Sequence, residues 1–479
     1  MKKACVSVRA LVAILVVWTV AEWHGMAVCV FADDVKTAAA EDWPRFLNAD
    51  FSGTAKLANP TGGSAADWDW DKEPTCRWSL SVGEGYGLGV VQDGAYFHFD
   101  ADAGQERLRK IDMTTGEVLW SQTSDLSYRD LYGYESGARC SPTIDHDQIF
   151  THGVAGMLTA RDRDSGEKQW RVDTNDRYHV VQNFFGAGSA PLIIEGAVLV
   201  MVGGSPIADQ SIAPGRLDRV SSDGSLLVAF DRHTGEELWK SGDDLASYSS
   251  PRTMRIDGKE YVLVLGREFL HVLDPVDGRS SSRIRFRADI LESVNAMVPV
   301  VDGQRVLVSD CYQLGATLFE IEQDQTGLTF TPVWQDPDRR RRDQSLRSHM
   351  STPVLHQGFL YACSGRNAPD SDFRCVDFAT GEVQWTAMQR QRSSATRLSD
   401  VLLVQTERGP LHVVGCNPEQ FDEIAIWELN EPFFDEQSSH PAIRFPCWSA
   451  PVVSGNSILV RGDKTVLCLE LPRPRSTAK

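Results

Sequence analysis

Apolar and polar residues alternate along most of the chain in short runs, and these runs end at Gly, Asp, Asn or Ser. Alternation with a period of two is the pattern of half-buried β-strands, because successive side chains point to opposite faces. No amphipathic helical period of useful length follows the N-terminus. The pattern therefore predicts an all-β protein assembled from hairpins.

One phrase recurs: an apolar strand ends at Asp, a turn containing Gly follows, and a returning strand carries Trp. Gly can adopt a positive φ in such a turn, and the Asp carboxylate can accept hydrogen bonds from turn amides. We expect each Trp to pack against the neighbouring unit. The clearest copies are Asp112, Gly116 and Trp120; Asp162, Gly166 and Trp170; Asp231, Gly235 and Trp239; and Asp377, Gly381 and Trp385.

A second hairpin phrase, in which a small residue and Pro begin an apolar run, precedes each copy, as in residues 141–153 and 450–462. The two hairpins make a four-stranded unit that repeats about every 50 residues, a length typical of a propeller blade. The last unit stops after three strands, whereas the first begins at Trp78 with a lone strand. We predict an eight-bladed β-propeller of four-stranded antiparallel blades, with the ring closed by the N-terminal strand so that two sheet edges disappear.

The N-terminus has the order of a secretory signal peptide: a positive start, the apolar run 11–20, and small residues before position 33. The alternative is a membrane anchor, but Glu22 and His24 end the run well before the length that a spanning helix needs. We therefore predict export to the periplasm or beyond, with no stable membrane insertion after cleavage. The predicted parts are a signal peptide (1–32), an N-terminal extension (33–72), the propeller (73–472) and a flexible tail (473–479).

Composition restricts the partners. The 479 residues are 42% hydrophobic and 24% charged, as in ordinary globular proteins, and the formal net charge of −18 disfavours binding to nucleic acid.

The cysteines form no CxxC motif. Cys363 and Cys375, on neighbouring strands of one predicted hairpin, are the candidate disulfide, since export permits one. The alternative is that they pack as small apolar side chains.

The repeat resembles that of the PQQ-repeat family, A-x-D-x-x-T-G-x-x-x-W, which Ala160, Asp162, Ser165, Gly166 and Trp170 match with Ser in place of Thr. The resemblance covers roughly residues 43–470, and the segment 43–46 resembles the opening of exported bacterial members. It implies the propeller fold. Distantly similar proteins imply different functions: the propeller lipoprotein of the outer-membrane β-barrel assembly machine is a scaffold without cofactor, whereas quinoprotein dehydrogenases hold PQQ and calcium.

Signals for catalysis are absent from the sequence. It has no G-x-S-x-G elbow, no H-E-x-x-H and no P-loop. It also lacks the adjacent cysteines that are common in quinoprotein dehydrogenases. Asp67, Asp69 and Asp71 are spaced as in a calcium loop, but Trp78 stands where the bidentate carboxylate belongs. We predict no catalytic residue and no metal ligand, and interpret the chain as a binding or scaffolding protein for a protein or an extracellular ligand. A PQQ- and calcium-dependent oxidoreductase is the alternative.

A ligand would bind where the segments entering the innermost strands surround the central channel. Each polar or aromatic residue there has the alternative role of capping a strand or packing a loop. The run Arg339, Arg340, Arg341 and Arg342 is an anion-site candidate at the rim, because guanidinium groups bind anions in a planar fork, or else a solvated loop neutralised by nearby Asp. The channel candidates are Tyr134, Glu135, Asn183, Phe184, Tyr248, Glu292, Asn295, His349, Arg392 and Trp448.

Overall fold

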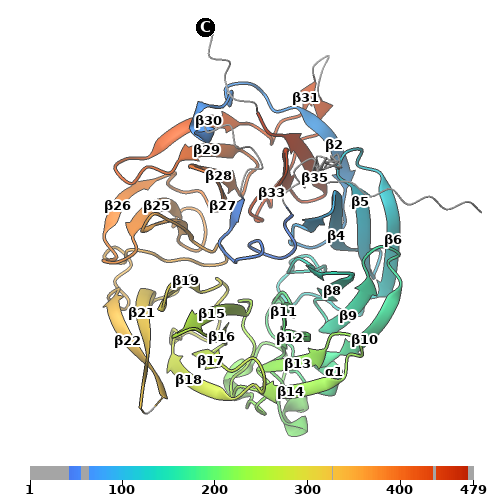
Figure 1. Ribbon diagram of the computed structural model, residues 1–479, viewed down its shortest axis with the longest axis vertical. Coiled ribbons are helices and arrows are strands. Elements are labelled where there is room, and N and C mark those ends of the chain that lie inside the picture. Colours follow the sequence, from blue (N-terminus) through green and yellow to red (C-terminus); the bar gives the residue numbers. More distant parts are fainter. Residues whose placement is uncertain (1–41, 56–63, 326, 435–438, 473–479) are drawn as a thin grey trace, which may run out of the picture. The chain divides into compact units, whose positions relative to one another are not determined.

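The computed structural model describes residues 42–55, 64–325, 327–434 and 439–472, so the predicted signal peptide and tail lie outside the described residues. Eight blades of four antiparallel strands follow one another around a ring, and the sheet of one blade gains a short fifth strand that is parallel (Figure 1). This arrangement confirms the predicted eight-bladed β-propeller. In each blade the first strand is innermost and the last is outermost.

The first four blades are formed in chain order. Blade 1 contains β3 (Val90–Gln92), β4 (Ala95–Asp102), β5 (Gln105–Asp112) and β6 (Val118–Asp125). Blade 2 contains β7 (Thr143–Asp145), β8 (Gln148–His152), β9 (Met157–Asp162) and β10 (Lys168–Asp173). Blade 3 contains β11 (Leu192–Ile194), β12 (Ala197–Met201), β13 (Leu227–Asp231) and β14 (Glu237–Ser241). Blade 4 contains β15 (Arg252–Ile256), β16 (Lys259–Leu265), β17 (Phe269–Leu273) and β18 (Ser280–Arg285).

The second half repeats the plan until the last blade. Blade 5 contains β19 (Val300–Asp302), β20 (Arg305–Asp310), β21 (Gly315–Asp324) and β22 (Gly327–Gln335). Blade 6 contains β23 (Val354–His356), β24 (Phe359–Ser364), β25 (Asp372–Asp377) and β26 (Val383–Ala387). Blade 7 contains β27 (Ser393–Leu398), β28 (Val401–Thr406), β29 (Leu411–Gly415) and β30 (Asp422–Trp427). Blade 8 contains β33 (Val452–Ser454), β34 (Ser457–Arg461), β35 (Thr465–Glu470) and the N-terminal strand β2 (Cys76–Ser81).

The Asp–Gly–Trp phrase links neighbouring blades at five of the junctions. In blade 2, Asp162 accepts hydrogen bonds from the backbone N–H groups of Asp164 and Ser165, and Gly166 has a φ of 75°. A Cβ atom on Gly166 would lie only 3.0 Å from the ring of Trp120 in blade 1, so the turn can pack flat on that ring because it has no side chain. The same contact joins Gly116 with Trp78, Gly235 with Trp170, Gly278 with Trp239 and Gly381 with Trp334.

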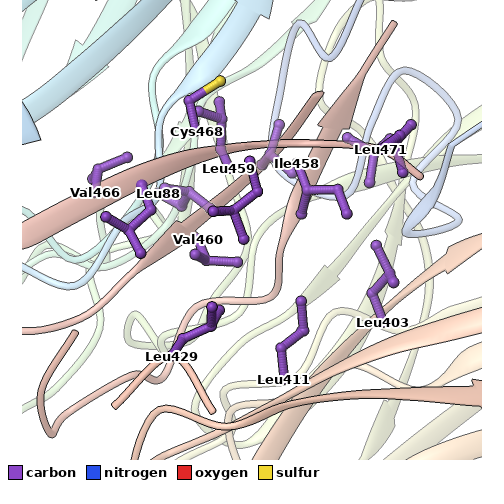
Figure 2. Close-up of a cluster of buried hydrophobic side chains, with 14 of the residues drawn as sticks. Leu88, Leu403, Leu411, Leu429, Ile458, Leu459, Val460, Val466, Cys468 and Leu471 are labelled. Atoms are coloured by element: carbon purple, nitrogen blue, oxygen red, sulfur yellow. The ribbon is translucent and has the colours of Figure 1, made fainter. Parts of the chain in front are cut away.

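The apolar cores lie between blades, and the largest one closes the ring. It joins blades 7, 8 and 1, and Figure 2 shows part of it around Leu411, Leu459 and Val466. Within it β2 pairs antiparallel with β35, with Trp78 opposite Cys468. Trp78 then donates its indole N–H to Met113 O of blade 1 at 3.0 Å. The predicted completion of the last blade by the N-terminal strand is therefore confirmed.

The segment 42–55 crosses one end of the channel and is called the floor segment here. It is the blue trace beside β27 at the centre of the ring in Figure 1. Trp43 forms a two-way backbone bridge with Val91 of blade 1, Pro44 O accepts from Ile144 N of blade 2, and β1 (Thr54–Ala55) pairs in parallel with β27 of blade 7. Phe51 lies 5.4 Å from the Arg252 guanidinium of blade 4. These contacts with blades on several sides of the ring place the segment across the channel.

Few other elements are present. They are α1 (Thr174–Arg177), the 3-10 turns Ala65–Asp67, Ile207–Ser211 and Leu217–Arg219, and the hairpin β31 (Phe433–Phe434) with β32 (Ser439–His440). None of the helices in the described part of the chain has the length and apolar character that crossing a bilayer requires.

Candidate functional site: the central funnel

A cavity of about 260 Å³ occupies the channel, and we call it the funnel. Its walls come from all eight segments that lead into the innermost strands, and its base comes from Trp43, Phe46 and Leu47 of the floor segment. The volume corresponds to on the order of nine water molecules at roughly 30 Å³ each. The funnel is therefore closed at one end and has room for one small organic molecule.

One side of the funnel is an aromatic wall contributed by blades 1 to 4 and 8. Ring centroids are 4.8 Å apart for Tyr86 and Trp448, 5.3 Å for Tyr134 and Phe185, and 5.5 Å for Phe185 and Tyr248. The Tyr248 hydroxyl accepts a hydrogen bond from Phe185 N at 2.7 Å, and burial raises the pKa of Tyr248 well above its usual value. This wall offers flat, uncharged surface to a ligand.

The other side is polar and is built by blades 5 to 7. The Tyr312 hydroxyl lies 3.3 Å from His349 Nε2, and the Arg366 guanidinium lies 5.0 Å from the centroid of the Tyr312 ring. Burial, followed by the charges of Arg392 and Arg366, lowers the pKa of His349 to about 3. The imidazole is therefore neutral at physiological pH, and the positive charge of this sector comes from the two arginines.

Arg392 connects the two sides. Its guanidinium lies 5.1 Å from the centroid of the Trp448 ring, and Nη2 donates to Arg366 O and to Asn367 Oδ1. The residue is 9% exposed, and its Nε atom is buried without a hydrogen-bond partner among the described residues. A third lining arginine, Arg139, is already neutralised, because it pairs with Asp130 at 2.9 Å.

Five of the ten channel candidates line the funnel: Tyr134, Tyr248, His349, Arg392 and Trp448. They come from blades 2, 4, 6, 7 and 8, so the segments entering the innermost strands do converge on one cavity. Tyr134 is 46% exposed and lies at the rim, whereas Tyr248 is partly buried.

The other five candidates do not line the funnel, mainly because their side chains engage the protein's own backbone or core. Asn183 donates to Ala246 O at 3.2 Å, and Asn295 donates to Gly266 O at 3.0 Å. Glu135 accepts from Gly85 N at 2.5 Å and pairs with Lys464 at 2.6 Å. Phe184 is in an apolar cluster beside the channel, and Glu292 is exposed to solvent.

The arginine run lies outside the funnel on an exposed loop. Arg339 pairs with Asp289 at 3.5 Å, Arg340 with Asp343 at 3.7 Å and Arg341 with Asp370 at 3.8 Å. Arg342 is exposed on the same loop. Its role as an anion site stays a prediction.

The candidate disulfide between Cys363 and Cys375 is not formed in the structure, which holds both as free thiols. The pairing of β24 with β25 places Cys375 opposite Tyr361, and Cys363 opposite Phe373. The two cysteines are thus diagonal neighbours on the sheet and not directly opposed. Both pack in the apolar core between blades 6 and 7, in the role of small hydrophobes.

Several lining residues were not singled out by the sequence. Tyr86 precedes the first innermost strand, as Tyr134 precedes the second, so the blade repeat could have indicated it. Phe185 follows the candidate Phe184 directly. Tyr312 and Arg366 come from loops between second and third strands, where the sequence carries no repeated signal. The same holds for the floor residues.

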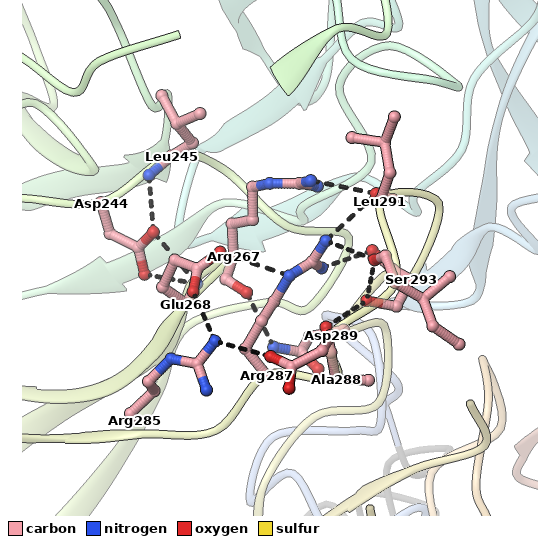
Figure 3. Close-up of polar contacts among 12 residues, drawn as sticks. Asp244, Leu245, Arg267, Glu268, Arg285, Arg287, Ala288, Asp289, Leu291 and Ser293 are labelled. Atoms are coloured by element: carbon pink, nitrogen blue, oxygen red, sulfur yellow. Dashed lines mark hydrogen bonds and ion pairs between the residues drawn. The ribbon is translucent and has the colours of Figure 1, made fainter. Parts of the chain in front are cut away.

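A second cavity of about 480 Å³ lies beside blade 4, and its lining holds more carboxylates than arginines. Figure 3 shows Arg267 and Arg287 donating to carbonyl groups of the segment 290–293, with Arg287 3.3 Å from Glu268. Burial, and next the charge of Arg287, lowers the pKa of Arg267 to about 10. In this cavity carboxylates outnumber arginines, five to three: Arg267, Arg285, Arg287, Asp218, Asp243, Asp244, Glu268 and Asp289.

The funnel residues do not fit a bound pair of PQQ and calcium. Calcium takes oxygen ligands that normally include carboxylates. No Asp or Glu is among the described residues that line the funnel, and the described residues form no cluster of three or more His, Cys, Asp or Glu side chains suited to a metal.

Comparisons with known proteins address the family and the fold. The model of the family described as outer membrane protein assembly factor BamB matches residues 53–222 and 222–411. No curated protein sequence matches the chain. Among solved structures, BamB from Moraxella catarrhalis is 14% identical, with a TM-score of 0.52 over 83% of this chain and 97% of that one.

Two further structures are similar. A europium-containing methanol dehydrogenase is 12% identical, with a TM-score of 0.59 over 88% of this chain and 89% of that one. The computationally designed Ika8 protein is 10% identical, with a TM-score of 0.51 over 83% and 99%. An assembly factor, a dehydrogenase and a designed protein share this ring, so the likeness shows the fold and does not show what the funnel does.

Proposed function

The chain belongs to the family of outer membrane protein assembly factor BamB, and on that premise we propose that it is a binding protein whose funnel holds one small organic ligand. The observation that supports this most directly is the closed funnel itself. Eight entry segments and the floor segment surround about 260 Å³ with aromatic rings on one side and hydrogen-bonding groups on the other. Concave, largely apolar cavities with a few convergent polar groups are the usual form of small-molecule sites.

Filling the funnel with a larger side chain should strongly weaken the binding of a small ligand. We expect wild-type protein to bind one molecule of the fluorescent probe 1-anilinonaphthalene-8-sulfonate per chain. Ala296→Trp, which places an indole group in the funnel, should weaken that binding about tenfold or more. Fluorescence titration measures both. Ala379→Trp is the matched control, because Ala379 is exposed on a turn of blade 6. Equal binding by the wild type and Ala296→Trp, or no binding by the wild type, would count against the funnel as a ligand site.

Docking of a protein at the same mouth is the second candidate. Tyr132, Tyr134 and Phe445 are 54%, 46% and 53% exposed and contact rings that line the funnel, and exposed aromatic groups beside a cavity are typical of protein contacts. Tyr132→Ser and Phe445→Ser alter this rim and leave the funnel lining in place. Retained probe binding together with loss of a protein partner in these variants would select the docking role.

We also propose that the protein acts outside the cytoplasm. The support is the positive start, the apolar run 11–20 and the small residues before position 33. Cleavage there leaves the whole floor segment, which begins at position 42, on the mature chain. Intact-mass analysis of the exported protein should find a chain that starts at Asp33. A full-length chain held in the inner membrane would instead support the anchor.

A further inference from the structure

The ligand's charge can be inferred from the polar side of the funnel, and this inference rests on the proposed function. Arg366 and Arg392 both line the cavity, and neither forms an ion pair with a carboxylate of the described residues. In the second cavity Arg285 and Arg287 each form an ion pair with Glu268, whereas Arg267 donates to the Leu291 carbonyl group.

The lack of a carboxylate partner should destabilise the protein most at Arg392. It is 9% exposed, and its buried Nε–H has no acceptor among the described residues. A buried charge without a partner destabilises a protein unless something else solvates it. Stacking on the Trp448 ring replaces part of the lost solvation. One backbone oxygen and one side-chain oxygen accept hydrogen bonds from Nη2. The nearby carboxylate of Glu407 is 3.4 Å from the Trp448 indole N–H and makes no ion pair with Arg392.

We propose that the funnel binds an organic oxyanion, a carboxylate or a phosphate ester, with its anionic group on Arg366 and Arg392 and its flat body against the aromatic wall. A planar guanidinium is suited to either oxyanion through paired N–H donors. His349 and Asn367 add hydrogen-bonding groups in the same sector. The Trp448 ring lies next to Arg392, and the rings of Tyr86 and Tyr134 follow, with centroids 4.8 Å and 6.1 Å from that of Trp448.

The test uses three probes that share a phenyl body: 3-phenylpropionate, 2-phenylethyl phosphate and the neutral 3-phenylpropan-1-ol. Calorimetric titration of the full-length mature protein should show that at least one of the anions binds about tenfold or more tightly than the alcohol. Whichever anion is preferred identifies the oxyanion. Arg366→Gln and Arg392→Gln should each reduce anion affinity about ten- to a hundredfold and leave alcohol affinity unchanged.

Two controls keep the outcome interpretable. Arg366 is exposed, so Arg366→Gln tests the proposal even if Arg392→Gln lowers the melting temperature. Arg340→Gln alters the exposed loop outside the funnel and should retain anion affinity. If the alcohol binds as tightly as both anions and Ala296→Trp abolishes its binding, the funnel is a ligand site but not an anion site. Loss of anion binding only in Arg340→Gln, or no binding of any probe, also overturns the proposal.

Discussion

Deletion of residues 1–82 is expected to leave a chain that does not fold cooperatively, because blade 8 loses β2. Trp78 and Leu80 of β2 and the adjacent Val82 are 7%, 8% and 5% exposed. Burial of three such side chains contributes about 5–8 kcal/mol, which is similar to the whole stability of a typical domain, about 5–15 kcal/mol. The deletion also exposes the edge of β35, a site for aggregation.

Shorter deletions distinguish the contribution of β2 to stability from that of the floor segment. A chain lacking residues 1–41 keeps every described element, and one lacking residues 1–63 loses the floor segment but keeps β2. We expect both to unfold in a single transition by circular dichroism, the second at a lower temperature. If the chain lacking residues 1–82 melts like the longer ones, ring closure by β2 is not what stabilises the fold.

A point substitution probes the same closure without removing backbone. Trp78→Ala should cost about 3–5 kcal/mol in urea unfolding, because the ring fills the space against Gly116 and donates to Met113 O. Leu119→Ala is the control. Leu119 is 51% exposed on β6, and its truncation should change stability by about 0.5 kcal/mol or less.

The blades were predictable because their determinants are local and repeated. Asp162, Gly166 and Trp170 fall at fixed offsets within one hairpin, and the same offsets recur wherever a turn must meet a ring from the preceding blade. Closure was predictable for a different reason. A lone Trp strand at one end and a missing fourth strand at the other leave two free edges that one pairing satisfies.

The floor segment was not predictable, because nothing local determines its path. Trp43, Pro44 and Gly53 form backbone hydrogen bonds with Val91, Ile144 and Arg397, residues that are distant in sequence. The segment has no alternation to set a register. Its sequence identified it as part of an N-terminal extension, but which surface it covers depends on the finished ring.

The funnel was predictable in position and less so in composition. Tyr134 and Trp448 were found because the blade repeat locates the entry segments. Asn183 and Asn295 occupy equivalent segments, yet their amides bond to Ala246 O and Gly266 O. Sequence position alone does not say whether a polar side chain turns to the channel or to its own backbone. Arg366 enters from a loop between strands, which the repeat does not mark.

Glu106 should make the protein less stable as the pH rises from about 4.5 to about 7. It is 5% exposed on β5, and its carboxyl group is inserted beside blade 2, where a Cβ atom on Gly153 would lie 1.8 Å from Oε1. Oε1 has no hydrogen-bond partner among the described residues. Burial raises the pKa of Glu106 to about 7, although a hydrogen bond from the Val154 backbone and the charge of Arg171 oppose the shift.

The direction of this pH dependence follows from the number of protons that the folded and the unfolded chain bind. Between the unfolded pKa, near 4.5, and the folded pKa, near 7, the folded chain holds a proton that the unfolded chain has released, so unfolding becomes easier as the pH rises. Above pH 7 the penalty is complete and amounts to about 3 kcal/mol. Glu106→Gln removes the charge and should raise the free energy of unfolding by nearly that amount at pH 8.5.

Urea unfolding at two pH values checks this. At pH 4.5 we expect Glu106→Gln and the wild type to differ by less than about 1 kcal/mol, because most of the wild-type carboxyl group is protonated when folded. Glu117→Gln is the matched control, since Glu117 is exposed after the Gly116 turn, and it should have little effect at either pH. A difference between Glu106→Gln and the wild type that does not change with pH would mean that Glu106 stays ionised between the blades, with its charge compensated by Arg171 and the Val154 amide.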